Sequence, residues 1–271
     1  MTSPGTACIT GASSGIGEAF ARRLAADGYS LLLHGRREQR LSALCDSLRQ
    51  QFGIRAEHLL AELSRPDELR AFEDRLKRTP DLTVLVNNAG YATIRPFSEE
   101  EIDGQEALIH THVTATVRLT HAALSGMLAR RTGTIVNVSS VAGFLNGPGS
   151  VTYCATKAYL ISFTETLHLE VGGRGIRLQV LCPGFTRSDF HSRLGHDTSG
   201  DFFKRFMSAE EVVEISLRDL RRGKIVSIPG LQYKVAAFLP RLLPRRLYYW
   251  IVLKRQGYKS KKARQTAGQP G

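Results

Sequence analysis

Cysteine is scarce in this sequence, and the spacing of the thiols argues against a metal centre. The chain has four cysteines among 271 residues, and none has the spacing of paired metal ligands. Three of them lie in or beside apolar runs, so we expect buried free thiols, which suit a reducing cytosol. The four are Cys8, Cys45, Cys154 and Cys182.

Long apolar runs are also missing. No stretch of about 18 or more uninterrupted apolar residues occurs, so a membrane-spanning helix is not expected. No secretory signal fits the front of the chain, because Thr2, Ser3 and Pro4 lead directly into the first predicted strand. These features predict a cytoplasmic protein.

Acidic residues are absent from the C-terminal segment. Residues 220–271 hold 13 of the 37 lysines and arginines but none of the 25 aspartates and glutamates. The net charge of +12 therefore belongs to this segment, because residues 1–219 have a net charge of −1. This distribution argues against a nucleic-acid-binding function for the main part of the chain.

The chain opens with a strand, a glycine-rich turn and a helix. Residues 6–10 are a short apolar run, and residues 15–27 have the apolar periodicity of a helix. Glycines in the turn let the backbone approach a pyrophosphate, which the amides and dipole at a helix N-terminus favour. This pattern predicts a dinucleotide site, although a tight structural turn is the alternative. The turn contains Gly11, Ser13, Ser14, Gly15, Ile16 and Gly17, with the spacing Gly-x-x-x-Gly-x-Gly.

A second predicted strand, residues 30–34, is followed by Gly35, Arg36 and Arg37. An acidic residue at this strand end binds the ribose 2′-hydroxyl of NAD, whereas arginine accommodates the 2′-phosphate of NADP. Arg36 therefore favours NADP(H). The alternative is that Arg36, Arg37 and Arg40 form the polar start of the next helix.

Tyr153 and Lys157 lie four residues apart in a helical setting, so they share one face of the helix. A cation beside the phenol favours the phenolate and lowers a pKa that is ordinarily about 10. Ser140 closes an apolar run at residues 134–138, where a hydroxyl can bind a substrate carbonyl. The three residues suggest acid–base chemistry, although a Tyr and Lys at this spacing can also be a solvated helix face.

With Asn87 to Gly90, these motifs resemble the short-chain dehydrogenase/reductase family over roughly residues 5–230. The resemblance implies an α/β fold: a single Rossmann-type, doubly wound domain with a mostly parallel seven-stranded sheet and helices on both faces. It implies catalytic roles for Ser140, Tyr153 and Lys157. It also implies further cofactor contacts at Glu62, Leu63, Asn88, Ala89, Gly90, Pro183, Gly184 and Thr186.

One position departs from the family pattern. His112 stands where the family has an Asn that holds a water in the proton relay to the catalytic Lys. Imidazole can also hold a water, and it titrates near neutral pH. The alternative is a helix histidine without a catalytic part.

The end of the chain predicts three further features. Residues 187–207 correspond to the family's variable lid, and its aromatics suggest an apolar or bulky carbonyl substrate. Residues 231–253 form an apolar and basic extension after a catalytic domain of residues 1–230, and residues 254–271 form a disordered basic tail. The extension fits attachment to anionic lipid, or else packing over the cleft or a subunit interface.

The resemblance implies an NADP(H)-dependent oxidoreductase that interconverts a carbonyl and a secondary alcohol. A 3-oxoacyl thioester, a steroid-like ketone and an apolar aldehyde are all compatible substrates, and no metal is required. A homodimer or homotetramer is expected from the family. The competing hypothesis is a cofactor-binding, membrane-associated scaffold with little turnover.

Overall fold

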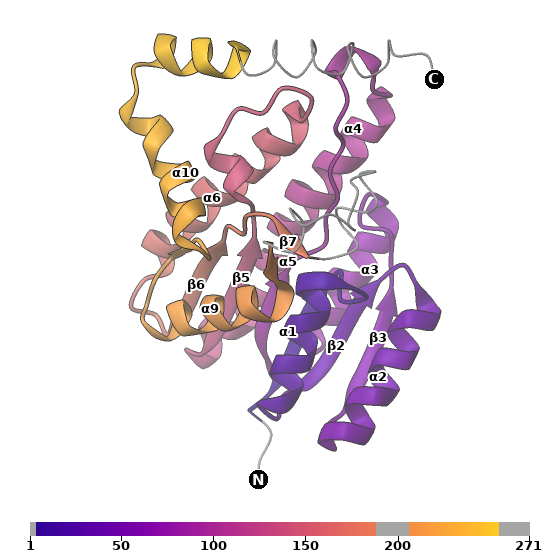
Figure 1. Ribbon diagram of the computed structural model, residues 1–271. Helices are drawn as coiled ribbons and strands as arrows, with labels where there is room; N and C mark the ends of the chain where they lie inside the picture. Colours follow the sequence, from indigo (N-terminus) through magenta and orange to yellow (C-terminus); the bar gives the residue numbers. More distant parts are fainter. Residues whose placement is uncertain (1–3, 188–205, 255–271) are drawn as a thin grey trace.

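The computed structural model describes residues 4–187 and 206–254 (Figure 1). The expected lid aromatics Phe190, Phe202 and Phe203, and the basic tail beyond residue 254, lie outside the described residues. Among those described, seven strands form one sheet in the order β3-β2-β1-β4-β5-β6-β9, and every pairing is parallel. The strands are β1 (Thr6–Thr10), β2 (Ser30–Gly35), β3 (Ala56–Leu60), β4 (Leu82–Asn87), β5 (Gly133–Val138), β6 (Ile176–Leu181) and β9 (Val226–Ser227).

The central strands are apolar runs because both of their faces are covered. Every residue of β1, β2 and β5 is buried. The chain winds outward from β1 through β2 to β3, then returns to place β4 on the other side of β1. Ligands of such sheets bind at the carboxyl ends of the strands, where the winding direction changes. Here this point lies between β1 and β4.

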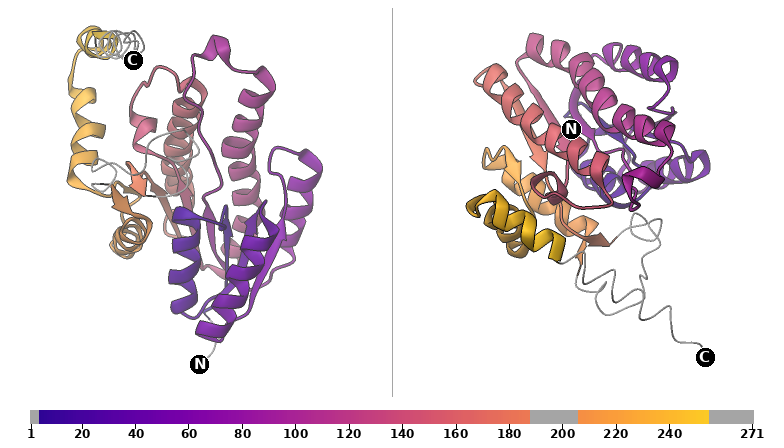
Figure 2. Two further views of the ribbon diagram at one scale, coloured as in Figure 1. Left: turned by 45° about the vertical axis from the view of Figure 1, so that its right-hand side comes forward. Right: turned by 90° about the horizontal axis from the view of Figure 1, so that it is seen from above.

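Helices cover both faces of the sheet, which confirms the predicted Rossmann-type architecture (Figures 1 and 2). Apolar side chains of α1, α2 and α9 pack into one core cluster, and those of α3, α5 and the end of α6 pack into another. The helices are α1 (Gly15–Ala26), α2 (Glu38–Phe52), α3 (Pro66–Lys77), α4 (Ile102–Ile109), α5 (Ala115–Arg130), α6 (Val151–Val171), α9 (Ala209–Arg221) and α10 (Leu231–Leu242). The four cysteines are buried free thiols, as predicted.

The chain between β4 and β5 is helical from Ile102 to Arg130, but one turn is widened. A π-helical turn, His110–Thr114, joins α4 to α5. The π-turn accommodates one more residue than an α-helical turn, and such turns occur frequently at functional sites. It contains His112, and hydrophobic periodicity alone does not reveal it.

The last strand of the sheet is short. Only Val226 and Ser227 form it, at the sheet edge beside Val180 and Leu181 of β6. A separate pair, β7 (Thr186–Arg187) and β8 (Met207–Ser208), leads into α9. A capping box opens that helix, with Glu211 N–H donating to Ser208 Oγ at 3.1 Å and Ser208 N–H donating to Glu211 Oε2 at 2.8 Å.

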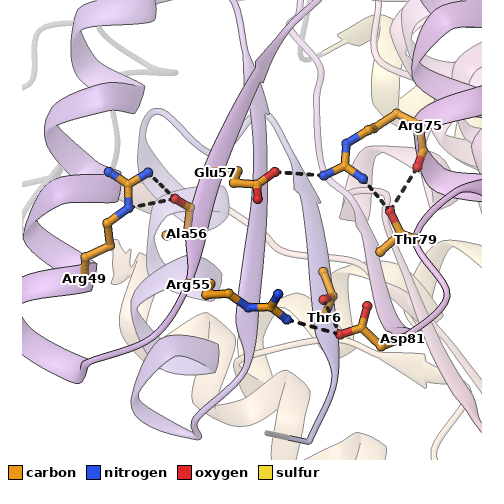
Figure 3. A network of polar contacts seen from close by, with 8 residues as sticks. All are labelled: Thr6, Arg49, Arg55, Ala56, Glu57, Arg75, Thr79 and Asp81. Carbon is orange, nitrogen blue, oxygen red and sulfur yellow. Dashed lines mark hydrogen bonds and ion pairs between the residues drawn. The ribbon is translucent and has the colours of Figure 1, made fainter.

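Charged side chains at the amino ends of the strands are satisfied by one another (Figure 3). Arg75 Nη2 lies 2.8 Å from Glu57 Oε2, and Thr6 Oγ1 donates to Asp81 Oδ2 at 2.9 Å. Arg55 pairs more loosely with Asp81, at 3.7 Å. Exposed pairs of this kind contribute about 0–1 kcal/mol each, so this end of the sheet has an ordinary polar surface.

The predicted C-terminal extension packs on the main body through the inner face of α10. Tyr233 and Ala237 are buried and share a core cluster with Ile161, Val180 and Cys182. Residues 245–254 form a further helix at the end of the molecule opposite the N-terminus (Figures 1 and 2). In the part of the chain that the structure describes, no helix is long and apolar enough to cross a membrane.

Candidate active site

Ser140, Tyr153 and Lys157 come together beyond the carboxyl end of β5. Ser140 follows that strand and caps a short 3-10 helix, Val141–Phe144, by accepting a hydrogen bond from Ala142 N–H at 3.1 Å. Its side chain is also hydrogen-bonded to that of Tyr153 on α6. Lys157 Nζ lies 5.6 Å from the centroid of the Tyr153 ring, as expected for a shared helix face.

The electrostatics differ from the sequence expectation. Lys157 was expected to lower the pKa of Tyr153, but burial raises it to about 12, and the hydrogen bond from Ser140 only partly opposes this effect. Burial also lowers the pKa of Lys157 to about 8. The ammonium of Lys157 donates to the Val138 carbonyl at 3.0 Å. Burial is the largest influence on the pKa of both Lys157 and Tyr153.

The neighbouring Ser139 bonds to the backbone. Its hydroxyl donates to the Lys157 carbonyl at 2.7 Å and so ties the end of β5 to the catalytic helix. Both serines after β5 therefore hold fixed positions relative to α6.

His112 has both ring nitrogens bonded to protein groups. Nε2 lies 3.1 Å from the Tyr91 amide, which can only donate, so Nε2 is the acceptor. Nδ1 lies 3.0 Å from Thr156 Oγ1, whose own proton goes to the Tyr153 carbonyl at 2.9 Å. The ring must therefore be neutral, with its proton on Nδ1. Burial and the charge of Lys157 hold the pKa of His112 well below its usual value, consistent with this tautomer.

The π-helical turn brings His112 against the end of the β4 segment. A Cβ at Gly90 would lie 2.7 Å from His112 Nε2, so glycine is required at that position. The imidazole thus connects the segment that follows β4, at Tyr91, to helix α6, at Thr156. Neither ring nitrogen remains for a water of the kind expected from the family pattern.

The glycine-rich turn is held tightly against the end of β4. Gly11 has φ +66°, and a Cβ there would lie 2.9 Å from Ala89 Cα. At Gly17, a Cβ would lie 2.3 Å from the Gly11 carbonyl oxygen. Asn88 Nδ2 donates to the carbonyls of Thr10 and Gly11, at 2.9 and 3.2 Å. Asn88 therefore supports the loop directly.

Helix α1 begins at Gly15, and Ser14 makes no side-chain capping bond to it. The first-turn amides, which include those of Ile16 and Gly17, have no partner within the helix. Such amides bind phosphate oxygens, so this cradle fits the dinucleotide predicted from the sequence.

Two arginines after β2 have different partners. Arg36 Nη1 pairs with Glu62 Oε2 at 2.9 Å beside the buried Leu63. Arg37 Nη2 donates to Ser13 Oγ at 3.0 Å and to Ser14 Oγ at 2.8 Å. The sequence pattern pointed to Arg36 and indicated no site role for Arg37. The available signal was the pair of hydroxyl residues in the glycine-rich turn, which an adjacent arginine can bind.

The turn after β6 lies between the 3-10 helix and α10. Val141 N–H donates to the Pro183 carbonyl at 3.0 Å, and Thr186 Oγ1 donates to the Gly184 carbonyl at 3.2 Å. A Cβ at Gly184 would lie 2.2 Å from the Tyr233 ring, and Tyr233 donates to the Phe185 carbonyl at 3.3 Å. Tyr233 thus supports the site although sequence reasoning did not select it. The four-residue spacing from Ala237 was the signal of an inward helix face.

Comparison with known proteins gives a consistent family. A family model described as short chain dehydrogenase matches residues 5–199. The chain is 31% identical over 215 residues to the 3-oxoacyl-(acyl-carrier-protein) reductase of Aquifex aeolicus, which covers 77% of this chain and 87% of that relative.

Solved structures extend the similarity over nearly the whole chain. A short-chain dehydrogenase from Sphingobium yanoikuyae in complex with NADPH superposes with a TM-score of 0.80 and 36% identity, covering 94% of this chain and 95% of that one. A bulky-bulky ketone specific alcohol dehydrogenase from Comamonas testosteroni gives a TM-score of 0.77 and 30% identity, covering 96% and 95%.

Proposed function

The chain belongs to the short-chain dehydrogenase family, and from this premise we propose that it is an NADP(H)-dependent oxidoreductase that interconverts a carbonyl and a secondary alcohol on an apolar substrate. The observation that carries the proposal is the hydrogen-bonded pair of Ser140 and Tyr153 beside the buried ammonium of Lys157. A protein that only bound the cofactor would not need this arrangement.

Each of these three residues has a distinct part in carbonyl reduction. Ser140 donates a hydrogen bond to the substrate oxygen and polarises the carbonyl. Tyr153, whose pKa is raised to about 12, is fully protonated at neutral pH and donates its proton as the alkoxide develops. The bound nicotinamide supplies the hydride. Lys157 then stabilises the phenolate that remains and holds the cofactor ribose, and in the reverse direction Tyr153 is the base.

For the cofactor, we propose that Arg36 and Arg37 bind the 2′-phosphate of NADP(H). Gly35, and not a carboxylate, ends β2 directly before Arg36, and guanidinium matches phosphate geometry. The NADPH bound to the Sphingobium relative supports this assignment. The glycine-rich turn of residues 11–17, called the phosphate loop below, also belongs to the proposed cofactor site. The site is completed by Glu62, Leu63, the segment from Asn88 to Gly90 and the turn from Pro183 to Thr186.

For His112, we propose a positioning role. The neutral ring joins Tyr91 to Thr156, one residue before Lys157, and so fixes the catalytic helix relative to the cofactor side of the site. A water in a proton relay to Lys157 would have to be held by a group other than this imidazole.

For the substrate, we propose a bulky or apolar ketone. Phe185 follows the turn beside the site and stacks on Phe206, with ring centroids 4.9 Å apart, so an apolar surface adjoins the cofactor side. The relatives act on a 3-oxoacyl group and on ketones with two bulky substituents. We further propose a cytoplasmic homodimer or homotetramer that makes peripheral membrane contact through its basic C-terminal segment.

The test is a titration of the purified full chain with NADPH and NADH, followed by a panel of carbonyls under the preferred cofactor. We expect tighter binding of NADPH and turnover of apolar ketones. Tyr153→Phe should reduce kcat by at least about 100-fold and leave NADPH affinity nearly unchanged. Tight binding without turnover on any carbonyl would instead favour the cofactor-binding scaffold. A preference for NADH would refute the roles given to the two arginines.

A further inference from the structure

Helix α10 has an outer face that nothing in the described part of the chain covers. Its inner residues Tyr233 and Ala237 are 9% and 1% exposed. Its outer apolar residues are between 52% and 80% exposed and recur at helical spacing along one stripe. They are Leu231, Val235, Phe238, Leu239 and Leu242.

The helix at residues 245–254 also exposes apolar side chains. Tyr249, Trp250 and Leu253 are 46%, 56% and 63% exposed. The helix lies at the end of the molecule opposite the N-terminus (Figures 1 and 2). Because β1 starts beside the N-terminus and all strands are parallel, this is also the end at which the strands finish and the active site lies.

The charge of this segment indicates which kind of partner it binds. Residues 220–271 have no aspartate or glutamate, so every lysine, arginine, aspartate or glutamate position in this segment is basic. Arg245 and Arg246 begin the second helix, and Lys254 Nζ lies 4.6 Å from the Trp250 ring centroid at its end. A second copy of the chain would bring the same positive charge to this surface. An anionic lipid surface complements both the apolar stripe and the cations.

The inner side of the same segment contacts the loop that follows Ser140. Asn146 N–H donates to Tyr248 Oη at 2.9 Å, and Arg241 Cζ lies 4.8 Å from the Phe144 ring centroid. Phe144 and Asn146 follow Ser140 by four and six positions, so these contacts fix the loop that leaves the catalytic serine. Lipid contact on one side of the segment would therefore act on the site through the other.

We propose that residues 231–254 are a lipid-docking platform that binds an anionic membrane surface and positions the loop that follows Ser140 through Tyr248 and Arg241. The platform orients the site mouth toward the bilayer, so the substrate class is carbonyl compounds that partition into membranes. This inference rests on the proposed oxidoreductase function for its second part, whereas lipid docking stands on the surface alone.

Docking is tested with the full chain and vesicles of phosphatidylglycerol and phosphatidylcholine. Trp250 is the single tryptophan of the sequence, so a blue shift of its emission reports insertion of this helix directly. We expect co-sedimentation and a blue shift with anionic vesicles, weakened by high salt and by Arg245→Gln with Arg246→Gln. Leu242→Gln with Phe238→Gln should weaken binding about tenfold or more. Leu169→Gln is the matched control, because Leu169 on α6 is 80% exposed like Leu242 but far from the platform in sequence.

Coupling is tested by measuring turnover of one water-soluble ketone and one ketone that partitions into the vesicles. Anionic vesicles should raise kcat/KM for the membrane-soluble ketone several-fold and leave the water-soluble one unchanged. Tyr248→Phe removes the hydroxyl that accepts the hydrogen bond from Asn146 N–H. The variant should bind vesicles normally but lose this enhancement.

Each failure has its own signature. Absence of vesicle binding and of the blue shift overturns the platform. Dissociation of a dimer by Leu242→Gln, without vesicle binding, overturns it in favour of a second copy as the occupant. Vesicle binding with equal turnover in Tyr248→Phe overturns the coupling. Loss of turnover on both ketones in all conditions refutes the oxidoreductase proposal and with it the substrate class, while the fluorescence result still decides docking.

Discussion

Replacing Lys157 with methionine is expected to stabilise the folded chain at neutral pH while removing activity. Methionine matches the length of the lysine side chain but has no charge to desolvate. Lys157 is only 5% exposed, and its ammonium donates to the Val138 carbonyl at 3.0 Å. The variant therefore exchanges one hydrogen bond for relief from a buried charge.

The magnitude follows from the pKa of Lys157, which burial lowers from 10.5 to about 8. Because the unfolded chain holds this proton more tightly, the folded state gains stability as pH rises from 8 to 10.5 and loses it as pH falls from 10.5 to 8, below which the penalty is constant. At pH 7 the buried charge destabilises the fold by about 3 kcal/mol. Loss of the bond to Val138 offsets about 1–2 kcal/mol of this, which leaves a net gain of about 1–2 kcal/mol.

The sign should reverse with pH. Near pH 10.5 the Lys157 side chain is neutral in the folded wild type, and its deprotonation costs little free energy there. The variant should therefore be less stable than wild type by about 1–2 kcal/mol at this pH, because only the lost hydrogen bond separates them. Urea unfolding at pH 7 and pH 10.5 gives both free energies, provided that wild type and variant have the same slope. Lys77→Met, at an exposed lysine of α3, is the matched control and should show no such crossing. A variant that is less stable at both pH values would refute the reasoning.

Substitutions at four further positions separate binding, positioning and folding roles. Arg36→Ala should weaken NADPH binding about tenfold or more and leave NADH binding unchanged, whereas Arg37→Ala should weaken both because it also releases the phosphate loop. Calorimetric titration distinguishes them, and an equal effect of Arg36→Ala on NADH would contradict its assignment. Thr156→Val leaves the Nδ1 proton of His112 without an acceptor and should lower the free energy of unfolding by about 1–3 kcal/mol, while Thr156→Ser should not. Ser208→Ala should lower it by about 0.5–2 kcal/mol through loss of the helix cap, and rescue by threonine would exclude a packing effect.

Local patterns predicted the fold and the centre of the site. The strands could be located because a parallel sheet covered on both faces requires apolar runs. The glycine spacing of the phosphate loop and the four-residue spacing of Tyr153 and Lys157 are also local, since one turn or one helix decides them. These features are in place in the structure.

Other features depend on contacts between distant parts of the chain. The neutral state of His112 is decided by Tyr91 and Thr156, 21 and 44 positions away. The direction of the pKa shift of Tyr153 depends on how burial compares with the distance to a cation, and the sequence contains neither quantity. The sequence indicated Arg36 alone, and only the fold shows that Arg36 pairs with Glu62 while Arg37 binds the phosphate loop.

The packing of Tyr233 on Gly184 has a consequence for the order of events during synthesis. The strands from β1 to β6 emerge from the ribosome first and can pair early, because domains fold as their N-terminal parts appear. The core layer around Cys182 is complete only after Tyr233 and Ala237 have been made. A nascent chain stalled before this point would therefore have its sheet and phosphate loop but an open layer beneath the turn at Gly184, so the complete domain can form only after almost all of the described chain has been translated.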